Sequence, residues 1–107
     1  MTISEASVDE LESALQAGAV LIDVRQPNEY EAGHVPGAIL VPLASVPDTL
    51  ELFASDVPTY VICRSGSRSY RACEYLEDQG IEAINIEGGT MACIISGRTT
   101  VAGDQPA

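Results

Sequence analysis

The sequence contains no lysine, so its basic residues are five arginines, which stand against 16 acidic residues for a net charge of -11 at pH 7. A chain with this charge repels polyanions, which argues against nucleic acid or an anionic membrane as a partner. No apolar run approaches the roughly 20 residues that a membrane-spanning helix needs. The first ten residues lack the basic and apolar segments of a secretory signal. We therefore expect a cytoplasmic protein.

Cysteine is also scarce. The three cysteines, Cys63, Cys73 and Cys93, cannot all pair within one chain, which argues against a secreted disulfide framework. Their spacing, in a chain with a single histidine, matches none of the common zinc-binding patterns. We therefore expect free thiols and no structural metal.

The chain has the size of one domain, since 107 residues of which 46% are hydrophobic are enough for a single core. Short apolar runs, suited to strands buried on both faces, alternate with helical segments, which predicts an α/β domain with a parallel sheet. We expect this domain over residues 1–98 and a flexible tail over residues 99–107. Strands are expected at 19–24, 38–41, 59–63 and 83–86, and helices at 8–17, 27–31, 46–55, 65–80 and 90–96.

Two of these helices carry recognisable start signals. Ser7 followed by Glu10 has the form of a capping box, which predicts that the first helix begins at Val8. Ser45 is expected to cap the third helix, with Pro47 in its first turn.

The segment most suggestive of chemistry begins where a predicted strand gives way to a helix. It consists of Cys63, Arg64, Ser65, Gly66, Ser67, Arg68 and Ser69. If this loop curls around the cysteine sulfur, its backbone N–H groups form a nest for negative charge. Together with the two arginines, that nest favours a thiolate at neutral pH, and hence a nucleophile. The simpler alternative is a buried cysteine at a strand end with no chemical role.

Three stretches resemble the motifs of the rhodanese family. The first is Asp23-Val24-Arg25 with Glu29-Tyr30 and the segment 33–38, the second is the Cys63 loop, and the third is the segment 88–92. The resemblance implies a three-layer, rhodanese-like α/β domain with a central five-stranded parallel sheet flanked by helices. It also implies that the strand of Asp23 lies beside that of Cys63, and that a short first strand lies near Ile3.

The resemblance also implies sulfur transfer without a metal or organic cofactor. Cys63 would be the nucleophile, attacking thiosulfate or a similar small anionic donor and holding the sulfur as a persulfide. The backbone from Arg64 to Arg68 would cradle that persulfide, and the two arginine side chains would bind the donor's oxygens. Cyanide or a thiol, including a protein thiol, would be the acceptor. The implied set of substrate-binding residues is Arg64, Ser65, Gly66, Ser67, Arg68 and Ser69.

Two other functions fit the same resemblance. One is a non-catalytic module that regulates, carries sulfur or binds a partner. The other is a phosphatase or arsenate reductase, for which the loop is less suited because Arg68 lies five positions after Cys63, whereas cysteine phosphatases place their arginine one position later.

The remaining polar candidates are expected to support the loop. Asp23, Arg25 and Glu29 fit a structural charge network at a strand end better than an acid-base set. His34, in the 33–38 segment, is expected to be structural, because the nest explains a thiolate without a base.

The other two cysteines are expected in the core. Cys73 falls on the buried stripe of its helix. Cys93 stands where rhodanese relatives often carry Trp, and is expected to be core filler, with a resolving thiol for Cys63 as the alternative.

Overall fold

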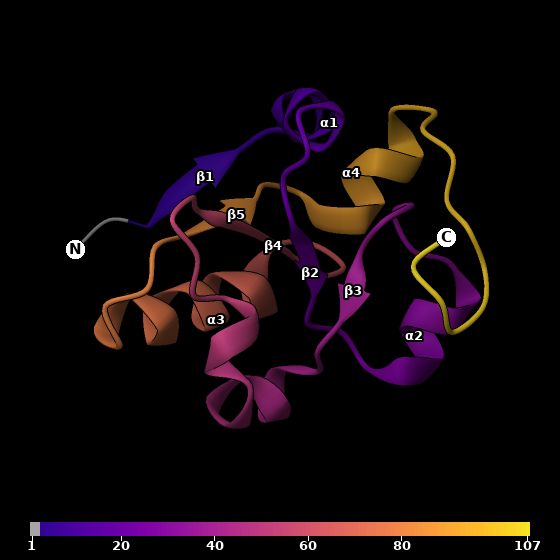
Figure 1. Ribbon diagram of the computed structural model, residues 1–107. Coiled ribbons are helices and arrows are strands. Elements are labelled where there is room, and N and C mark those ends of the chain that lie inside the picture. The colour runs from indigo at the N-terminus through magenta and orange to yellow at the C-terminus, as the bar shows by residue number, and fades with distance from the viewer. Residues whose placement is uncertain (1–2) are drawn as a thin grey trace.

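Strands and helices alternate along the chain, which the computed structural model describes over residues 3–107 (Figure 1). The elements in order are β1 (Ser4–Ala6), α1 (Val8–Gln16), β2 (Leu21–Asp23), α2 (Pro27–Ala32), β3 (Ile39–Leu40), the 3₁₀ helices η1 (Leu43–Asp48) and η2 (Leu50–Leu52), β4 (Thr59–Ile62), α3 (Ser67–Asp78), β5 (Ala83–Ile86) and α4 (Gly89–Ile95).

All five strands are parallel and form one sheet in the order β1-β5-β4-β2-β3. The predicted α/β architecture is therefore confirmed. Strand β2 pairs with β4, with Asp23 opposite Ile62, as the resemblance implied. Strand β1 begins directly after Ile3 and pairs with β5. Because parallel strands end at the same edge, this order brings the residues after β2, β4 and β5 together.

The two faces of the sheet carry separate core clusters. Ile22 and Val61 point to the side covered by α3 and the 3₁₀ helices, where they pack with Phe53 and Leu76. The neighbouring positions of β2 and β4 point to the opposite side, which α1, α2 and α4 cover. Figure 1 shows these layers, with α1 and α4 above the sheet and α3 below it. Burial on both faces explains why the strand segments are almost continuously apolar.

The first helix begins as predicted. Ser7 Oγ accepts a hydrogen bond from the Glu10 backbone N–H, and Glu10 Oε1 accepts one from the Ser7 N–H, so both halves of the capping box are present. The pairing satisfies two N–H groups that have no partner within the helix.

The helix predicted after Ser45 is wrong. Ser45 lies inside η1, and the segment forms two short 3₁₀ helices separated at Thr49, whose φ of -134° breaks the helical path. Pro47 has no N–H to donate, so it cannot join an α-helical ladder. The N–H of Leu43 is instead fixed to the carbonyl of Val24, which anchors η1 to the end of β2.

The C-terminal segment, predicted to be flexible from residue 99 onward, lies against the domain. Val101 and His34 exchange two backbone hydrogen bonds of 2.9 Å. Nearer the end, the Gly37 N–H donates to the Pro106 carbonyl at 2.8 Å. The structure therefore places this segment beside the 33–38 turn rather than projecting from the domain.

Candidate active site

Cys63 follows β4 directly and opens the loop that leads into α3. Gly66 is the N-cap of α3 and has a φ of 107°, a left-handed conformation that favours glycine. This turn folds the loop back, so that N–H groups approach the sulfur of Cys63. The predicted position of the cysteine, between a strand end and a helix start, is confirmed.

Hydrogen-bond donors surround the Cys63 sulfur. The Gly66 N–H lies 3.1 Å from Sγ, and the Ser69 hydroxyl lies 3.3 Å from it. Burial by itself raises the pKa of the thiol. The Ser69 hydroxyl and the backbone N–H groups of Ser69, Gly66 and Ser65 outweigh burial and lower the pKa. The loop therefore favours the thiolate, through hydrogen bonds to the charged form.

The first turn of α4 packs against this loop and supports it. The backbone N–H and hydroxyl of Thr90 both donate to the Cys63 carbonyl, at 2.9 and 3.1 Å, and the Met91 N–H donates to the Arg64 carbonyl at 3.0 Å. A Cβ on Gly89 would lie 2.4 Å from the Cys63 carbonyl oxygen. Only glycine permits this contact, because backbone atoms on both sides cannot move apart.

Arg68 is already paired within the protein. Its guanidinium donates to both carboxylate oxygens of Glu29, at 2.7 and 2.9 Å. The Arg68 hydrogen bond lowers the pKa of Glu29 to about 2, despite the opposing effect of burial. The same pairing raises the pKa of Arg68, to which the nearby charges of Cys63 and Asp23 also contribute. The structure thus joins Glu29 to the Cys63 loop and places a carboxylate beside the charge of Arg68.

Asp23 and Arg25 form the second charge pair, as the structural interpretation predicted. Both are buried, and the Arg25 guanidinium donates to the Asp23 carboxylate at 2.8 and 3.0 Å. A further donation, to the Gly33 carbonyl at 2.8 Å, ties the end of β2 to the end of α2. These contacts hold the wall beside the Cys63 loop.

The other loop residues face outward. Arg64, Ser65 and Ser67 are exposed, whereas Ser69 is buried. Arg64 borders a cleft of about 420 Å³, and Glu29, Thr90 and several apolar residues complete its walls. The full lining is Arg25, Glu29, Ala32, Gly33, Arg64, Thr90, Met91, Ile94 and Thr100. Arg64, for which no ion-pair partner is found within residues 3–107, thus places a guanidinium at this cleft beside the Cys63 loop.

Asn85 is a residue of the site that the sequence motifs do not indicate. This buried residue on β5 lies 2.5 Å from the Ser69 hydroxyl through its Oδ1, and its Nδ2 donates to Glu5 and to the Gly66 carbonyl. A polar residue inside the apolar run Ala83-Ile84-Asn85-Ile86 is the signal that could have identified it.

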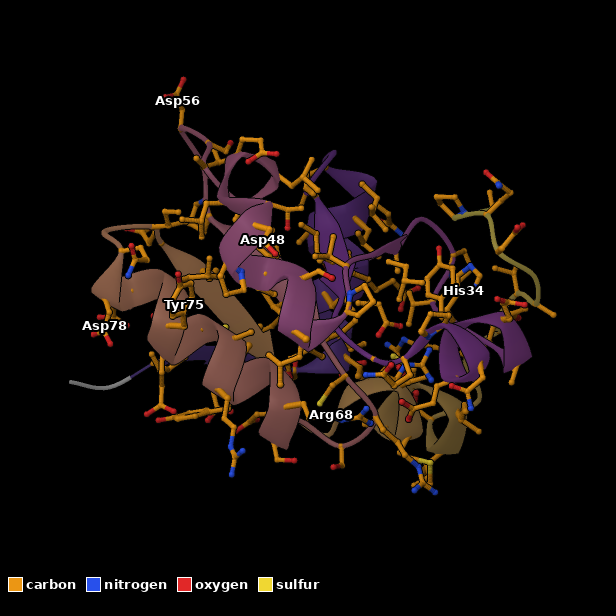
Figure 2. The ribbon with its side chains drawn as sticks, turned by 90° about the horizontal axis from the view of Figure 1, so that it is seen from below. His34, Asp48, Asp56, Arg68, Tyr75 and Asp78 are labelled. Carbon is orange, nitrogen blue, oxygen red and sulfur yellow. The ribbon has the colours of Figure 1, made fainter. Side chains whose placement is uncertain are left out.

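His34 lies apart from the thiol loop. Its ring stacks on Tyr30 with centroids 3.7 Å apart, and its nitrogens lie 2.8 Å from the carbonyls of Tyr30 and Gln105. Figure 2 shows His34 beside the C-terminal segment, well separated from Arg68 at the start of α3. These contacts support the predicted structural role.

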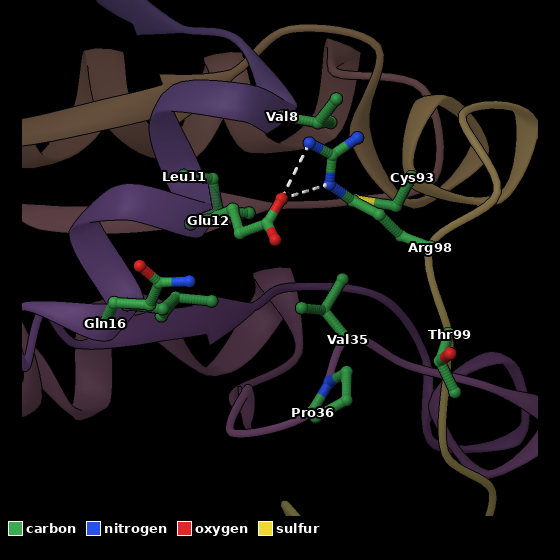
Figure 3. A pocket seen from close by; sticks show the side chains of 10 residues that line it. Val8, Leu11, Glu12, Gln16, Val35, Pro36, Cys93, Arg98 and Thr99 are labelled. Carbon is green, nitrogen blue, oxygen red and sulfur yellow. Dashed lines mark hydrogen bonds and ion pairs between the residues drawn. The ribbon is translucent and has the colours of Figure 1, made fainter.

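Cys73 and Cys93 are both buried. Burial raises the pKa of Cys73 to about 12 and also raises that of Cys93. Cys93 packs in the cluster on the opposite face of the sheet from Cys63 and borders a cleft of about 380 Å³ between α1 and α4 (Figure 3). This placement supports the core interpretation of Cys93 over a relay to Cys63.

Within residues 3–107, no three His, Cys, Asp or Glu side chains gather as a metal site would require. In the same part of the chain, no helix has the length and apolar character needed to span a bilayer.

Comparison with known proteins agrees with the geometry. The Rhodanese-like domain family matches residues 7–94. A sulfurtransferase of Allochromatium vinosum is 37% identical over 84 residues, 78% of each chain. The thiosulfate sulfurtransferase GlpE of Pseudomonas entomophila is 42% identical over 71% of this chain and 72% of its own. The crystal structure of a rhodanese-related protein from Thermoplasma volcanium superposes with a TM-score of 0.85 at 27% identity, covering 94% of this chain and 99% of that one.

Proposed function

The chain belongs to the rhodanese-like domain family, and on that premise we propose that it transfers a sulfane sulfur from thiosulfate or a similar donor, through a persulfide on Cys63. The observation that carries the proposal is the set of donors around Sγ, which lowers the pKa of the thiol although the residue is buried. Such a thiolate is nucleophilic at neutral pH.

In the first step, a lone pair of the Cys63 thiolate forms a bond to the outer sulfur of thiosulfate. The sulfur–sulfur bond of the donor breaks, and its electron pair leaves with sulfite. The negative charge of the enzyme now lies on the outer sulfur of the persulfide. Backbone N–H groups of the loop, which already point inward, stabilise that charge without reorganising.

In the second step, cyanide or a thiolate attacks the outer sulfur of the persulfide. The bond to Sγ breaks, its electron pair returns to Cys63, and the thiolate is regenerated. Splitting the exchange into two displacements requires one nucleophile and no external oxidant or reductant. All the protein groups that take part in these two steps belong to this chain.

Arg64 is the residue best placed to bind an anionic donor. Its side chain lines the cleft beside the loop, and the other loop arginine is held by Glu29. In a chain with a net charge of -11, a guanidinium at the cleft lowers the repulsion that a small anion meets beside Cys63.

A second function is favoured by a different observation. Cys63 has 0% of its surface exposed, and Arg68 pairs with Glu29, which favours a non-catalytic module that binds a partner. In that case Cys63 would react with iodoacetamide only after unfolding. Rapid alkylation of the folded protein would instead show that the loop opens often enough for catalysis.

The test of the proposal is the production of thiocyanate from thiosulfate and cyanide. We expect turnover by the wild-type protein and by Cys93→Ala, whose thiol lies in the opposite core cluster, and none by Cys63→Ser. Equal turnover by Cys63→Ser, or none by any of the three folded proteins, would reject this function.

A further inference from the structure

The Ser69 hydroxyl has one hydrogen and three acceptors within reach. Cys63 Sγ and the Gly66 carbonyl each lie 3.3 Å from Ser69 Oγ, and Asn85 Oδ1 lies 2.5 Å from it. A hydroxyl donates one hydrogen bond at a time, so these acceptors compete. The two lone pairs of the Gly66 carbonyl already accept from the Tyr70 N–H at 3.1 Å and from Asn85 Nδ2 at 3.2 Å, which leaves the sulfur and Asn85 Oδ1 as the main rivals.

The orientation of the Asn85 amide is fixed by its other contacts. Its Nδ2 donates to Glu5 Oε2 at 2.9 Å and to the Gly66 carbonyl at 3.2 Å. Rotating the amide by half a turn would set Oδ1 against a carboxylate and a carbonyl, leaving two lone-pair repulsions in a buried site. Oδ1 must therefore face Ser69, where it acts only as an acceptor.

We propose that Asn85 is a positioning residue for the reaction at Cys63: its Oδ1 holds the Ser69 hydroxyl hydrogen whenever Sγ carries no negative charge, and releases it to Sγ when the thiolate forms. The Ser69 hydroxyl can then donate to either of two acceptors, Cys63 Sγ or Asn85 Oδ1. Glu5 takes part indirectly, because it fixes the amide in the accepting orientation.

This role matters because the charge moves during sulfur transfer. In the thiolate, Sγ is the stronger acceptor and takes the Ser69 hydrogen, since hydrogen bonds to charged groups are about twice as strong. Once the persulfide forms, the charge lies on the outer sulfur, and a buried hydroxyl without an acceptor would cost free energy. Asn85 removes that cost. This step rests on the proposed function, whereas the competition for the hydrogen does not.

The proposed role and a merely structural role of Asn85 predict opposite changes in the pKa of Cys63. Loss of Asn85 Oδ1 removes the acceptor that favours the uncharged sulfur. The thiolate is then stabilised relative to the thiol, and the pKa of Cys63 falls. Loosening of the loop would instead withdraw N–H donors from Sγ and raise that pKa. Easier access to the covered sulfur would raise the maximal alkylation rate without moving the midpoint of its pH profile.

The experiment measures iodoacetamide alkylation of the Cys63 peptide as a function of pH. We expect Asn85→Leu to move the midpoint to lower pH and to speed alkylation about threefold at pH 6, the equivalent of one modest hydrogen bond. In a Ser69→Ala background, the same substitution is expected to leave the midpoint unchanged, because Sγ and Asn85 Oδ1 no longer have a hydroxyl hydrogen to compete for. An unchanged or higher midpoint in Asn85→Leu, or an equal shift without Ser69, overturns the proposal.

If Asn85→Leu fails to fold, Asn85→Ala removes the same acceptor with a smaller side chain and adds no charge. The midpoint is expected to fall in Asn85→Ala and to stay unchanged when Ser69→Ala is also present, and an unchanged or higher midpoint in Asn85→Ala alone overturns the proposal. A separate measurement on folded Asn85→Leu is the persulfide yield at a fixed ratio of thiosulfate to sulfite, expected to fall about threefold. If no persulfide forms in the wild-type protein, the proposed function fails, while the alkylation midpoints still decide the role of Asn85.

Discussion

Arg68 and Glu29, 39 residues apart in the sequence, are joined by two hydrogen bonds of 2.7 and 2.9 Å that tie α3 to α2. The resemblance to rhodaneses assigned the guanidinium to the donor's oxygens, and the structure gives it a carboxylate instead. On the proposed function, a dianion such as thiosulfate would meet a carboxylate beside one of the two loop arginines. The pair sets how strongly the cleft attracts anionic donors.

Substituting Glu29→Gln is expected to lower the KM for thiosulfate about threefold, because it removes a negative charge from the cleft and frees the charge of Arg68. The kcat should change little, since Glu29 does not contact the sulfur. The matched control is Glu31→Gln, which removes the same charge from the exposed side of α2. Equal effects of the two substitutions on KM would show that only net charge matters.

The ion pair also has a defined pH range. The pKa of Glu29 is lowered from 4.5 to about 2, so the pair contributes its full stability above pH 4.5 and loses it as the pH falls through 2. Urea unfolding should therefore separate the wild-type protein from Glu29→Gln by about 1 kcal/mol or less at pH 7, and by progressively less as the pH falls from 4.5 through 2. Activity between pH 5 and 8 should follow the Cys63 thiolate alone. A difference in stability that does not shrink over this acid range would contradict this account.

Gly89 should be one of the least replaceable residues near the site. A Cβ there would meet the carbonyl oxygens of Cys63 and Arg64 at 2.4 and 2.7 Å, and the φ of 57° adds strain. We expect Gly89→Ala to destabilise the protein by about 3 kcal/mol and to reduce activity more than stability alone explains, because the Cys63 loop must shift. Gly97→Ala is the control, since it has a φ of 85° with open space around it, and should cost about 1 kcal/mol. Urea midpoints and thiocyanate rates distinguish the two.

The buried pair of Asp23 and Arg25 should be essential for folding rather than for chemistry. Replacing Asp23 by Asn leaves a buried guanidinium without its counter-charge, which typically costs about 3 to 5 kcal/mol. Asp9→Asn, which removes one exposed partner of Arg98, is expected to leave the urea midpoint nearly unchanged. If Asp23→Asn unfolds at the same urea concentration as the wild-type protein, the pair does not support the site as described.

The sequence predicted the architecture because its apolar runs report burial directly. The continuous run around Leu21 and the run ending at Ile62 indicated parallel strands, and the position of Cys63 after the second run followed from chain order alone. Local signals also sufficed for α1, where Ser7 and Glu10 satisfy each other within four residues.

Long-range polar partners were beyond that reasoning. The pairing of Arg68 with Glu29 depends on how α2 and α3 meet, and the contact of Asn85 with Ser69 depends on β5 lying beside β4. The helix predicted after Ser45 failed for a local reason, since Pro47 has no N–H to donate and Thr49, with a φ of -134°, leaves the helical path. Spacing in the sequence cannot show which of several polar groups a fold will bring into contact.

The most direct test of the central claim is the mass of the Cys63 peptide after the folded protein is exposed to thiosulfate and rapidly trapped. A Cys63 thiolate in a nest of N–H donors predicts one added sulfur atom on that peptide, absent from Cys63→Ser and removed by cyanide with formation of thiocyanate. A Cys63 peptide of unchanged mass, from folded protein whose loop is shown by alkylation to admit small reagents, would contradict it.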